Sequence, residues 1–305
     1  MKHPGVGLLS AIEDAYGLQA CTTSRLYGGE EAVVWRIDTP LGAYVVMEYP
    51  QWRTVPELVW VHQLSRHLKS LVPETVVPLA AGNGRTLVVS TDSPVAVFPF
   101  IAGETLDKDD RHLRFQAARL LARLHAHLLT VTIGTRPRSG PEAPANWWRP
   151  PDAEEIVDPE LDALVSELQA GTRRLIKAHI HGDYYRRNLL CRDGEIVGII
   201  DWNDAHVDWL IQEVAWSTWE FCKNRAGDAL LVDRAEEFVA AYTAAGGPGI
   251  QDAHDLILPF IRLRLRDEIR GHLAARARGL PGDADYASAE RRAFAKLRDS
   301  SLMSA

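Results

Sequence analysis

Apolar residues follow a different pattern in the two parts of the chain. In the first hundred residues, short runs at 31–38, 42–49, 86–90 and 95–100 alternate or are continuously apolar, which predicts strands. The turn residues 39–42 join the first two runs and predict a hairpin. Residues 54–71 form the exception, because Thr54 and Glu57 have the spacing of a capping box and open a predicted helix.

Beyond residue 105 nearly every segment has helical periodicity. Residues 105–129 are strongly amphipathic, with Ala117, Leu120, Leu121 and Leu124 on one stripe. Further helices are predicted over 158–177, 209–223, 230–245, 252–277 and 284–299. Residues 131–152 hold five prolines and predict a loop that is long enough to be a lid or a substrate loop. The change of pattern predicts an α+β protein with two lobes, residues 1–101 and 102–305.

Composition narrows the class of protein. The chain has 305 residues, 46% of them hydrophobic and 25% charged, and a net charge of −7, which argues against nucleic acid as a partner. No apolar run approaches the 18 or so residues of a membrane span, and Glu13 and Asp14 interrupt any signal-peptide core. Three widely spaced cysteines indicate a reducing compartment. We therefore expect a cytoplasmic protein without a membrane partner.

The most informative stretch is residues 181–201, HGDYYRRNLLCRDGEIVGIID. Asp183 is followed by Asn188 and, thirteen residues later, by Asp201. The intervening Asp193-Gly194 pair favours a two-residue hairpin turn. A hairpin closed there pairs Arg192 with Glu195 and places Asn188 opposite Ile199, so that Asn188 and Asp201 meet at its open end. A surface hairpin that happens to end in an acid is the alternative.

These three side chains suit phosphoryl transfer. Magnesium prefers hard oxygen ligands, and γ-phosphoryl transfer needs a metal to neutralise charge and a carboxylate to orient the attacking hydroxyl. We predict that Asp183 accepts or orients the hydroxyl proton of the substrate. Asn188 and Asp201 are the predicted magnesium ligands.

The spacing is similar to that of the kinase catalytic loop and its metal-binding acid, with His-Gly-Asp and IIDWNDA as the local sequences. In these motifs the chain resembles the aminoglycoside phosphotransferase family, which includes antibiotic, choline, homoserine and fructosamine kinases. The resemblance implies a bilobal, protein-kinase-like fold with a small β-rich N-terminal lobe and a larger, mostly helical C-terminal lobe. It also implies ATP and Mg²⁺ as cofactors.

The resemblance implies nucleotide contacts in the first lobe. FPFIAGETL resembles the hinge of the family, where the carbonyl of Pro99 and the N–H of Ile101 would bind adenine. Gly28 and Gly29 precede a strand, where their amides could cover the phosphates; an ordinary turn is the alternative. The family usually has a phosphate-binding lysine at the position of Met47.

Two arginines are candidates to replace that lysine. Arg36 lies on the partner strand of the hairpin and Arg53 lies just beyond it. Glu57, the natural partner of the lysine, is explained as a cap residue.

Substrate contacts are suggested by aromatic and acidic residues. Trp147 and Trp148 lie on the proline-rich loop, and Trp202 follows the predicted metal ligand. Trp209, Trp216 and Trp219 share one helix face and are expected in the core. Asp204 could attract an amine-bearing substrate. His181 and Glu213 are expected to hold the catalytic loop.

A basic stripe gives the opposite indication for substrate charge. Arg262, Arg266 and Arg270 recur four residues apart, where they either pair with nearby acids such as Asp267 or receive a substrate carboxylate or phosphate.

The leading hypothesis is an ATP- and magnesium-dependent O-phosphotransferase that acts on a hydroxyl of a small molecule, an aminoglycoside or a related natural-product antibiotic. The alternative is a small-metabolite kinase that resembles homoserine or choline kinases. A nucleotide-binding pseudokinase is the third hypothesis, suggested by Met47. The predicted partners are a nucleotide and a small hydroxyl substrate, and the sequence predicts no oligomeric state.

Overall fold

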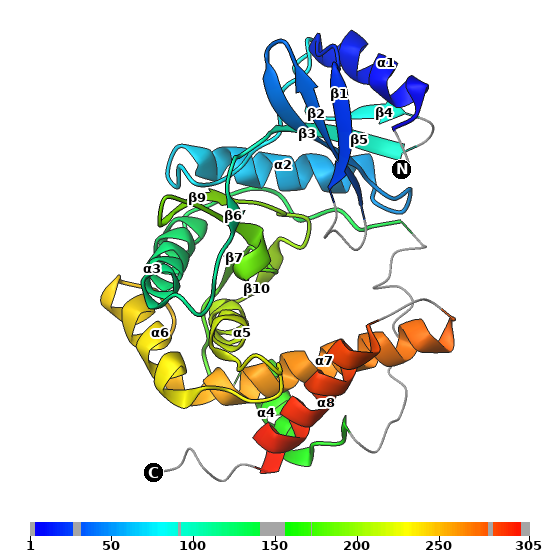
Figure 1. Ribbon diagram of the computed structural model, residues 1–305. Coiled ribbons are helices and arrows are strands. Elements are labelled where there is room, and N and C mark those ends of the chain that lie inside the picture. Colours follow the sequence, from blue (N-terminus) through cyan, green and yellow to red (C-terminus); the bar gives the residue numbers. More distant parts are fainter. Residues whose placement is uncertain are drawn as a thin grey trace.

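The computed structural model describes residues 4–26, 32–90, 93–140, 156–171, 173–279 and 283–299. These residues form a small lobe built on a sheet and a larger lobe of helices (Figure 1). The α+β, bilobal, kinase-like fold expected from the sequence is confirmed by this arrangement and by the solved structures described below.

The small lobe contains a five-stranded antiparallel sheet. Its strands are ordered β1-β2-β3-β5-β4 and are β1 Thr22–Leu26, β2 Val33–Thr39, β3 Gly42–Glu48, β4 Val88–Ser90 and β5 Ser93–Pro99. The predicted hairpin is confirmed, since Thr39 pairs with Gly42 across its turn. This register places Met47 between Val34 on β2 and Ala96 on β5, in the middle of the sheet.

Two helices flank this sheet. Helix α1, Val6–Tyr16, is absent from the sequence prediction, and its Leu8 and Ile12 pack with Trp35 and Val46 of the sheet. Helix α2, Val55–Lys69, begins after Thr54, whose hydroxyl accepts from the Glu57 amide at 3.4 Å. The predicted N-terminal cap is therefore confirmed. Helix α2 lies between the sheet and the rest of the molecule (Figure 1).

The larger lobe follows the predicted helices closely. Its elements are β6 Glu104–Thr105, α3 Arg111–Leu128, α4 Pro159–Gln169, β7 Lys177–Ile180, η3 Arg186–Asn188, β8 Leu189–Arg192, β9 Glu195–Ile199, β10 His206–Trp209, α5 Leu210–Cys222, α6 Val232–Ala244, η4 His254–Leu256, α7 Ile257–Ala277 and α8 Ala284–Asp299. The predicted helix over 158–177 ends early, because Gly171 adopts a φ of 71° soon after α4. The chain then enters β7, which leads directly to His181.

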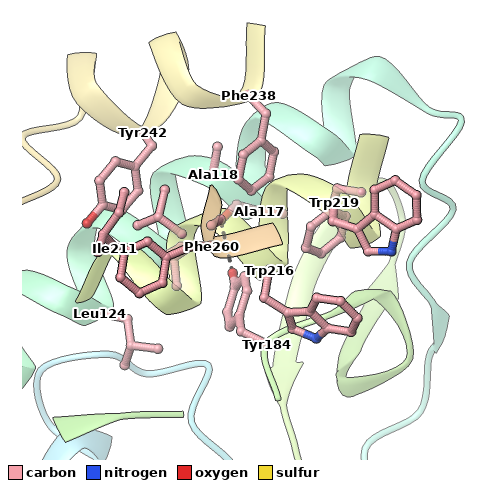
Figure 2. Packing of buried hydrophobic residues seen from close by; sticks show 14 of the residues in the cluster. Ala117, Ala118, Leu124, Tyr184, Ile211, Trp216, Trp219, Phe238, Tyr242 and Phe260 are labelled. Carbon is pink, nitrogen blue, oxygen red and sulfur yellow. Dashed lines mark hydrogen bonds between the residues drawn. The ribbon is translucent and has the colours of Figure 1, made fainter. Parts of the chain in front are cut away.

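Aromatic residues from several helices form the core of this lobe. Trp216, Trp219, Phe238 and Phe260 are at most 6% exposed and belong to the same buried cluster as Tyr184 (Figure 2). The Tyr184 hydroxyl donates to the carbonyl of Ala117 on α3 at 2.9 Å. Because Tyr184 directly follows Asp183, the core fixes the position of the loop that carries Asp183.

A membrane span needs a helix that is both long and apolar. Among the described residues, none of the helices meets that requirement.

Candidate active site

One buried carboxylate holds the loop that carries Asp183. Glu213 on α5 accepts from the backbone N–H groups of His181 at 3.1 Å and Gly182 at 2.6 Å. Its Oε2 also lies 2.8 Å from Nε2 of His125. Burial raises the pKa of Glu213, but the hydrogen bond and charge of His125 and the charge of His181 lower it overall. Glu213 thus has the bracing position expected from the sequence.

His181 supports the same loop. Its Nε2 lies 3.1 Å from the carbonyl of Ile200, and its Nδ1 accepts from the Asp183 amide at 3.3 Å. The imidazole therefore links the catalytic loop to the segment that carries Asp201. Burial lowers the pKa of His181, which favours the neutral ring that this pair of contacts requires.

Trp202 corrects one sequence prediction. Its ring centroid lies 4.6 Å from that of His181, and the residue is 4% exposed. It packs against His181, so that almost none of its surface is open to a substrate. The sequence suggested a substrate contact because Trp202 is adjacent to Asp201, but adjacent residues point in different directions.

The hairpin after the loop forms with one change of register. Asp193 and Gly194 both have positive φ, 53° and 79°, as the predicted two-residue turn requires. Arg192 pairs with Glu195 as predicted, but a bulge at Leu190/Cys191 shifts the remaining pairs by one residue. Leu189 therefore pairs with Ile199, which the prediction placed opposite Asn188.

The bulge does not separate the proposed ligands. The carbonyl of Asn188 accepts from the Ile200 amide at 3.0 Å, which keeps Asn188 beside the end of β9. Its Nδ2 donates to the carbonyl and to Oδ2 of Asp183, both at 2.9 Å. With the amide nitrogen committed to Asp183, the carboxamide oxygen is the atom that Asn188 can offer to a cation.

Asp201 and Asp204 complete an acidic group around Asp183. Burial, and then the charges of Asp204 and Asp201, raise the pKa of Asp183 well above its ordinary value, while Arg264 opposes the shift. Asp201 has a φ of 60°, which is rare for a residue with a side chain. A group of carboxylate and carboxamide oxygens is a set of donor atoms that suits magnesium.

Gly182 allows the two acidic segments to touch. It has a φ of 85°, and a Cβ at this position would lie 2.2 Å from the carbonyl oxygen of Asp204. Any side chain would push the catalytic loop away from residues 201–205. Glycine is therefore required at this contact.

Met47, at the position where the family usually has a lysine, lies next to the segment that carries Asp201. Nδ2 of Asn203 lies 3.7 Å from Sδ of Met47. Arg36 points elsewhere, because it pairs with Asp38 at 2.7 Å. Arg53 is the candidate that reaches the site: it is 4% exposed and lies 3.2 Å from the carboxylate of Asp204.

Glu57 has a larger role than capping. Its Oε1 accepts from Nη1 of Arg53 at 2.8 Å, from Nη2 of Arg136 at 2.5 Å and from the Ser139 hydroxyl at 2.8 Å. Arg136 was missed by sequence reasoning, since nothing in its local sequence marks it apart from the proline-rich segment around it. A charged residue within such a segment is the signal that could have been followed.

The predicted nucleotide and substrate contacts are placed only in part. Pro99 is the last residue of β5 and pairs with Tyr44, and Ile101 follows it; both are half-buried. Gly28 and Gly29, and likewise Trp147 and Trp148, lie outside the described residues.

The basic stripe on α7 is neutralised. Arg262 pairs with Asp158, Arg266 with Asp162 at 2.7 Å, and Arg270 with Asp267 at 3.2 Å. The arginine that faces the site is Arg264, which sequence reasoning missed. It pairs with Glu268 at 2.8 Å and is influenced by the charges of Asp183 and Asp204.

Curated relatives of this chain are homoserine kinases. The enzyme of Methylobacillus flagellatus is 29% identical over 216 residues, which cover 68% of this chain and 66% of that protein, just under two thirds. The enzyme of Polaromonas naphthalenivorans is 25% identical and covers 70% of each chain.

Solved structures share the fold at lower identity. An amicoumacin kinase in complex with AMP-PNP, Ca²⁺ and its antibiotic has a TM-score of 0.70 at 15% identity, covering 96% of this chain and 93% of the other. A microcompartment-associated aminopropanol kinase has a TM-score of 0.68 at 18% identity, with 95% and 94% covered. The choline kinase of Streptococcus pneumoniae has a TM-score of 0.67 at 15% identity, with 95% and 97% covered.

The family model described as the phosphotransferase enzyme family matches residues 22–256. This range runs from the first strand of the small lobe to the start of α7 and includes Asp183, Asn188 and Asp201. The chain therefore belongs to the phosphotransferase enzyme family and is a small-molecule kinase.

Proposed function

We propose that this kinase is an ATP- and Mg²⁺-dependent O-phosphotransferase whose acceptor is a hydroxyl on an amine-bearing small molecule. The observation that carries the proposal is the grouping of Asp183 with Asn188, Asp201 and Asp204. A carboxylate that Asn188 orients, beside oxygen atoms that could bind a metal, suits proton transfer from a hydroxyl.

In this proposal Asp183 is the catalytic residue. The acceptor oxygen forms a bond to the γ-phosphorus of ATP, the bond from that phosphorus to the β,γ-bridging oxygen breaks, and ADP leaves. The hydroxyl proton passes to Oδ of Asp183 and then to solvent. Asn188 holds the Asp183 carboxylate through its Nδ2, so the base is oriented before the substrate arrives.

Asn188 and Asp201 are the proposed magnesium ligands. Magnesium bound there would neutralise the charge on the β- and γ-phosphates. The chain contributes the placement of the two ligands: Asn188 is fixed by Asp183, and Asp201 follows β9, whose Ile199 forms backbone hydrogen bonds with the strand-like segment 74–76.

The small lobe is the proposed nucleotide-binding part, with residues 1–101 and 102–305 as the functional division. Adenine would lie at the end of β5, against the carbonyl of Pro99 and the N–H of Ile101. Gly28 and Gly29 would cover the phosphates. In this arrangement the phosphates would extend toward Asp201.

The acceptor side of the site is acidic, which favours a cationic substrate. The charge of Glu220 raises the pKa of Asp183, and the charges of Glu220, Glu290 and Glu268 raise the pKa of Tyr286. Burial is the larger cause of both shifts. Because Lys223 pairs with Glu220 and Arg264 with Glu268, an ammonium group would be attracted mainly by the carboxylates grouped at Asp183, Asp201 and Asp204.

Two substrates fit this description. An aminoglycoside or related antibiotic carries several amines, and the amicoumacin kinase has the highest of the TM-scores given above. Homoserine carries one amine and a carboxylate, and it is favoured by the curated relatives. The pairing of Arg262, Arg266 and Arg270 with acids leaves that stripe without spare charge for the carboxylate, which favours the first candidate.

A coupled ADP-release assay with paired substrates tests the proposal. Homoserine would be compared with 4-hydroxybutyrate, and 1-amino-2-propanol with 2-propanol, alongside choline, spectinomycin and other aminoglycosides. We expect Mg²⁺-dependent turnover only with amine-bearing members. Turnover of the deaminated partner at an equal rate would contradict the ammonium requirement, and activity without a divalent metal would contradict the mechanism.

A further inference from the structure

Two arginines, the buried Arg53 and the partly buried Arg136, connect α2 to the segment that carries Asp201. We propose that Arg53 and Arg136, here called the arginine clamp, are positioning residues that hold residues 201–205 against the catalytic loop. They donate to the carbonyl of Asn203, whose side chain contacts Met47 at the position where the family usually has a lysine. The inference rests on the proposed function of Asp201 as a magnesium ligand.

The clamp is anchored on the small lobe. Glu57 of α2 is fully buried and receives both guanidinium groups on its Oε1. Burial raises the pKa of Glu57, but hydrogen bonds from Arg136 and Ser139 and the charge of Arg53 lower it overall. The carboxylate is therefore ionised and ties the two arginines together.

The clamp donates hydrogen bonds to the backbone of residues 203–205, which follow Asp201. Nη1 of Arg53 donates to the carbonyl of Asn203 at 3.1 Å, and Nη2 of Arg136 donates to the same carbonyl at 2.8 Å. Nη1 of Arg136 donates to the carbonyl of Ala205 at 2.5 Å. Nη2 of Arg53 also reaches Oδ1 of Asp204 at 3.2 Å. These bonds fix the residues that directly follow Asp201.

The opposite side of this segment contacts the catalytic loop. The carbonyl of Asp204 lies so close to Gly182 that a Cβ there would approach it to 2.2 Å. Residues 203–205 are thus held between the clamp and the residue before Asp183. A shift of the clamp would move Asp201 relative to Asp183, and with it the metal ligands.

Charge balance explains why the clamp acts on the protein and not on the nucleotide. The two guanidinium groups face the carboxylates of Glu57 and Asp204, so their charges cancel. Met47 faces the same segment through Asn203. A lysine pairs with one glutamate and keeps donors for phosphate, whereas the Nη atoms of the clamp are directed at protein oxygens.

The test measures ATP affinity by calorimetry in MgCl₂ and in EDTA for Arg53→Met and Arg136→Met. We define the Mg²⁺ gain as the factor by which ATP binds more tightly in MgCl₂ than in EDTA. The structure predicts that both variants keep the ATP affinity measured in EDTA. Their Mg²⁺ gain should fall by about 10-fold or more, the scale expected when groups that orient metal ligands are removed. Weaker binding in EDTA would mean that the arginines bind phosphate directly. An unchanged Mg²⁺ gain would mean that the arginines do not position Asp201. Either result overturns the inference.

Controls separate this inference from the proposed function and from misfolding. Arg111→Met removes an ion pair with Glu237 whose arginine side chain is 65% exposed, and it should leave both affinities unchanged. Arg53→Lys should restore part of the Mg²⁺ gain, because it keeps one donor. If the methionine variants do not fold, Glu57→Gln loosens the same clamp. A wild-type protein without any Mg²⁺ gain would refute the proposed function itself.

Discussion

The catalytic loop and strand β3 differ in how they preserve function. The loop keeps every polar group expected there, and each is held by contacts from its own lobe: Glu213 holds the backbone, and Asn188 holds Asp183. Strand β3 has Met47 where the family usually has a lysine, and arginines from other segments hold the neighbouring loop. A reacting atom must occupy one place, whereas the side chains that hold a neighbouring loop can come from several segments.

The largest effect is expected where the chemistry is located. Asp183→Asn removes the proposed proton acceptor and should lower turnover by about 100- to 10,000-fold. Steady-state kinetics with any substrate that the panel identifies would measure the change. Asp193→Asn makes the same replacement at the exposed hairpin turn and should leave turnover unchanged. If both variants kept wild-type rates, the mechanism would be wrong.

A large loss of stability is expected at the support of the loop. Glu213→Gln leaves His125 and two backbone N–H groups with a weaker, neutral partner, which should cost about 3 to 5 kcal/mol in the free energy of unfolding. Chemical denaturation would measure it. An equally stable variant would show that the loop does not depend on this carboxylate.

The pH dependence of the same variant has a definite sign. The folded-state pKa of Glu213 lies below its ordinary value, so the folded state binds fewer protons than the unfolded state in this window. The carboxylate therefore adds stability above its ordinary pKa, and this stability is lost as pH falls through the lower, folded pKa. The gap between wild type and Glu213→Gln should narrow in acid, and a gap that widens in acid would contradict the sign.

A smaller loss is expected at the clamp. Glu57→Gln keeps an acceptor for the arginines but removes the negative charge. We expect this change to lower the free energy of unfolding by about 1 to 3 kcal/mol. Since the pKa of Glu57 is also lowered, this contribution too should fade as pH falls. Thermal unfolding across acidic pH would measure it, and a cost larger than that of Glu213→Gln would reverse the comparison.

The smallest effect is expected at Met47. Met47→Lys restores the usual family residue but places an ammonium beside Asn203, close to Arg53 and Arg136. Because both arginines of the clamp already engage Glu57, the new charge would not gain this carboxylate as a free partner, and ATP affinity should change by less than about fivefold, or ~1 kcal/mol. A large gain in affinity would show that the site still depends on a strand lysine.

Local patterns predicted much of the fold. The hairpin at 39–42, the cap at Thr54 and the helices after residue 105 follow from spacing within a few residues. The turn at Asp193-Gly194 was equally visible. Helix α1 was missed, since only Leu8 and Ile12 mark its buried face, and the bulge at Leu190/Cys191 has no signal in the residues themselves.

Contacts between distant segments were the part that could not be predicted. Arg136 and Glu57 are 79 residues apart, and Arg53 and Asp204 are 151 apart. The sequence shows that these side chains are charged but not which partner each one meets. Asp183 and Asn188 were recognised together because they are only five residues apart on one loop.

The most direct test of this account measures the ATP affinity of Asp201→Asn in MgCl₂ and in EDTA, beside the wild-type protein. The account predicts that Mg²⁺ strengthens ATP binding to the wild type and that this gain is largely lost in the variant, while affinity in EDTA is kept. A variant that retains the full Mg²⁺ gain would contradict the assignment of Asp201 as the metal ligand on which the proposed reaction depends.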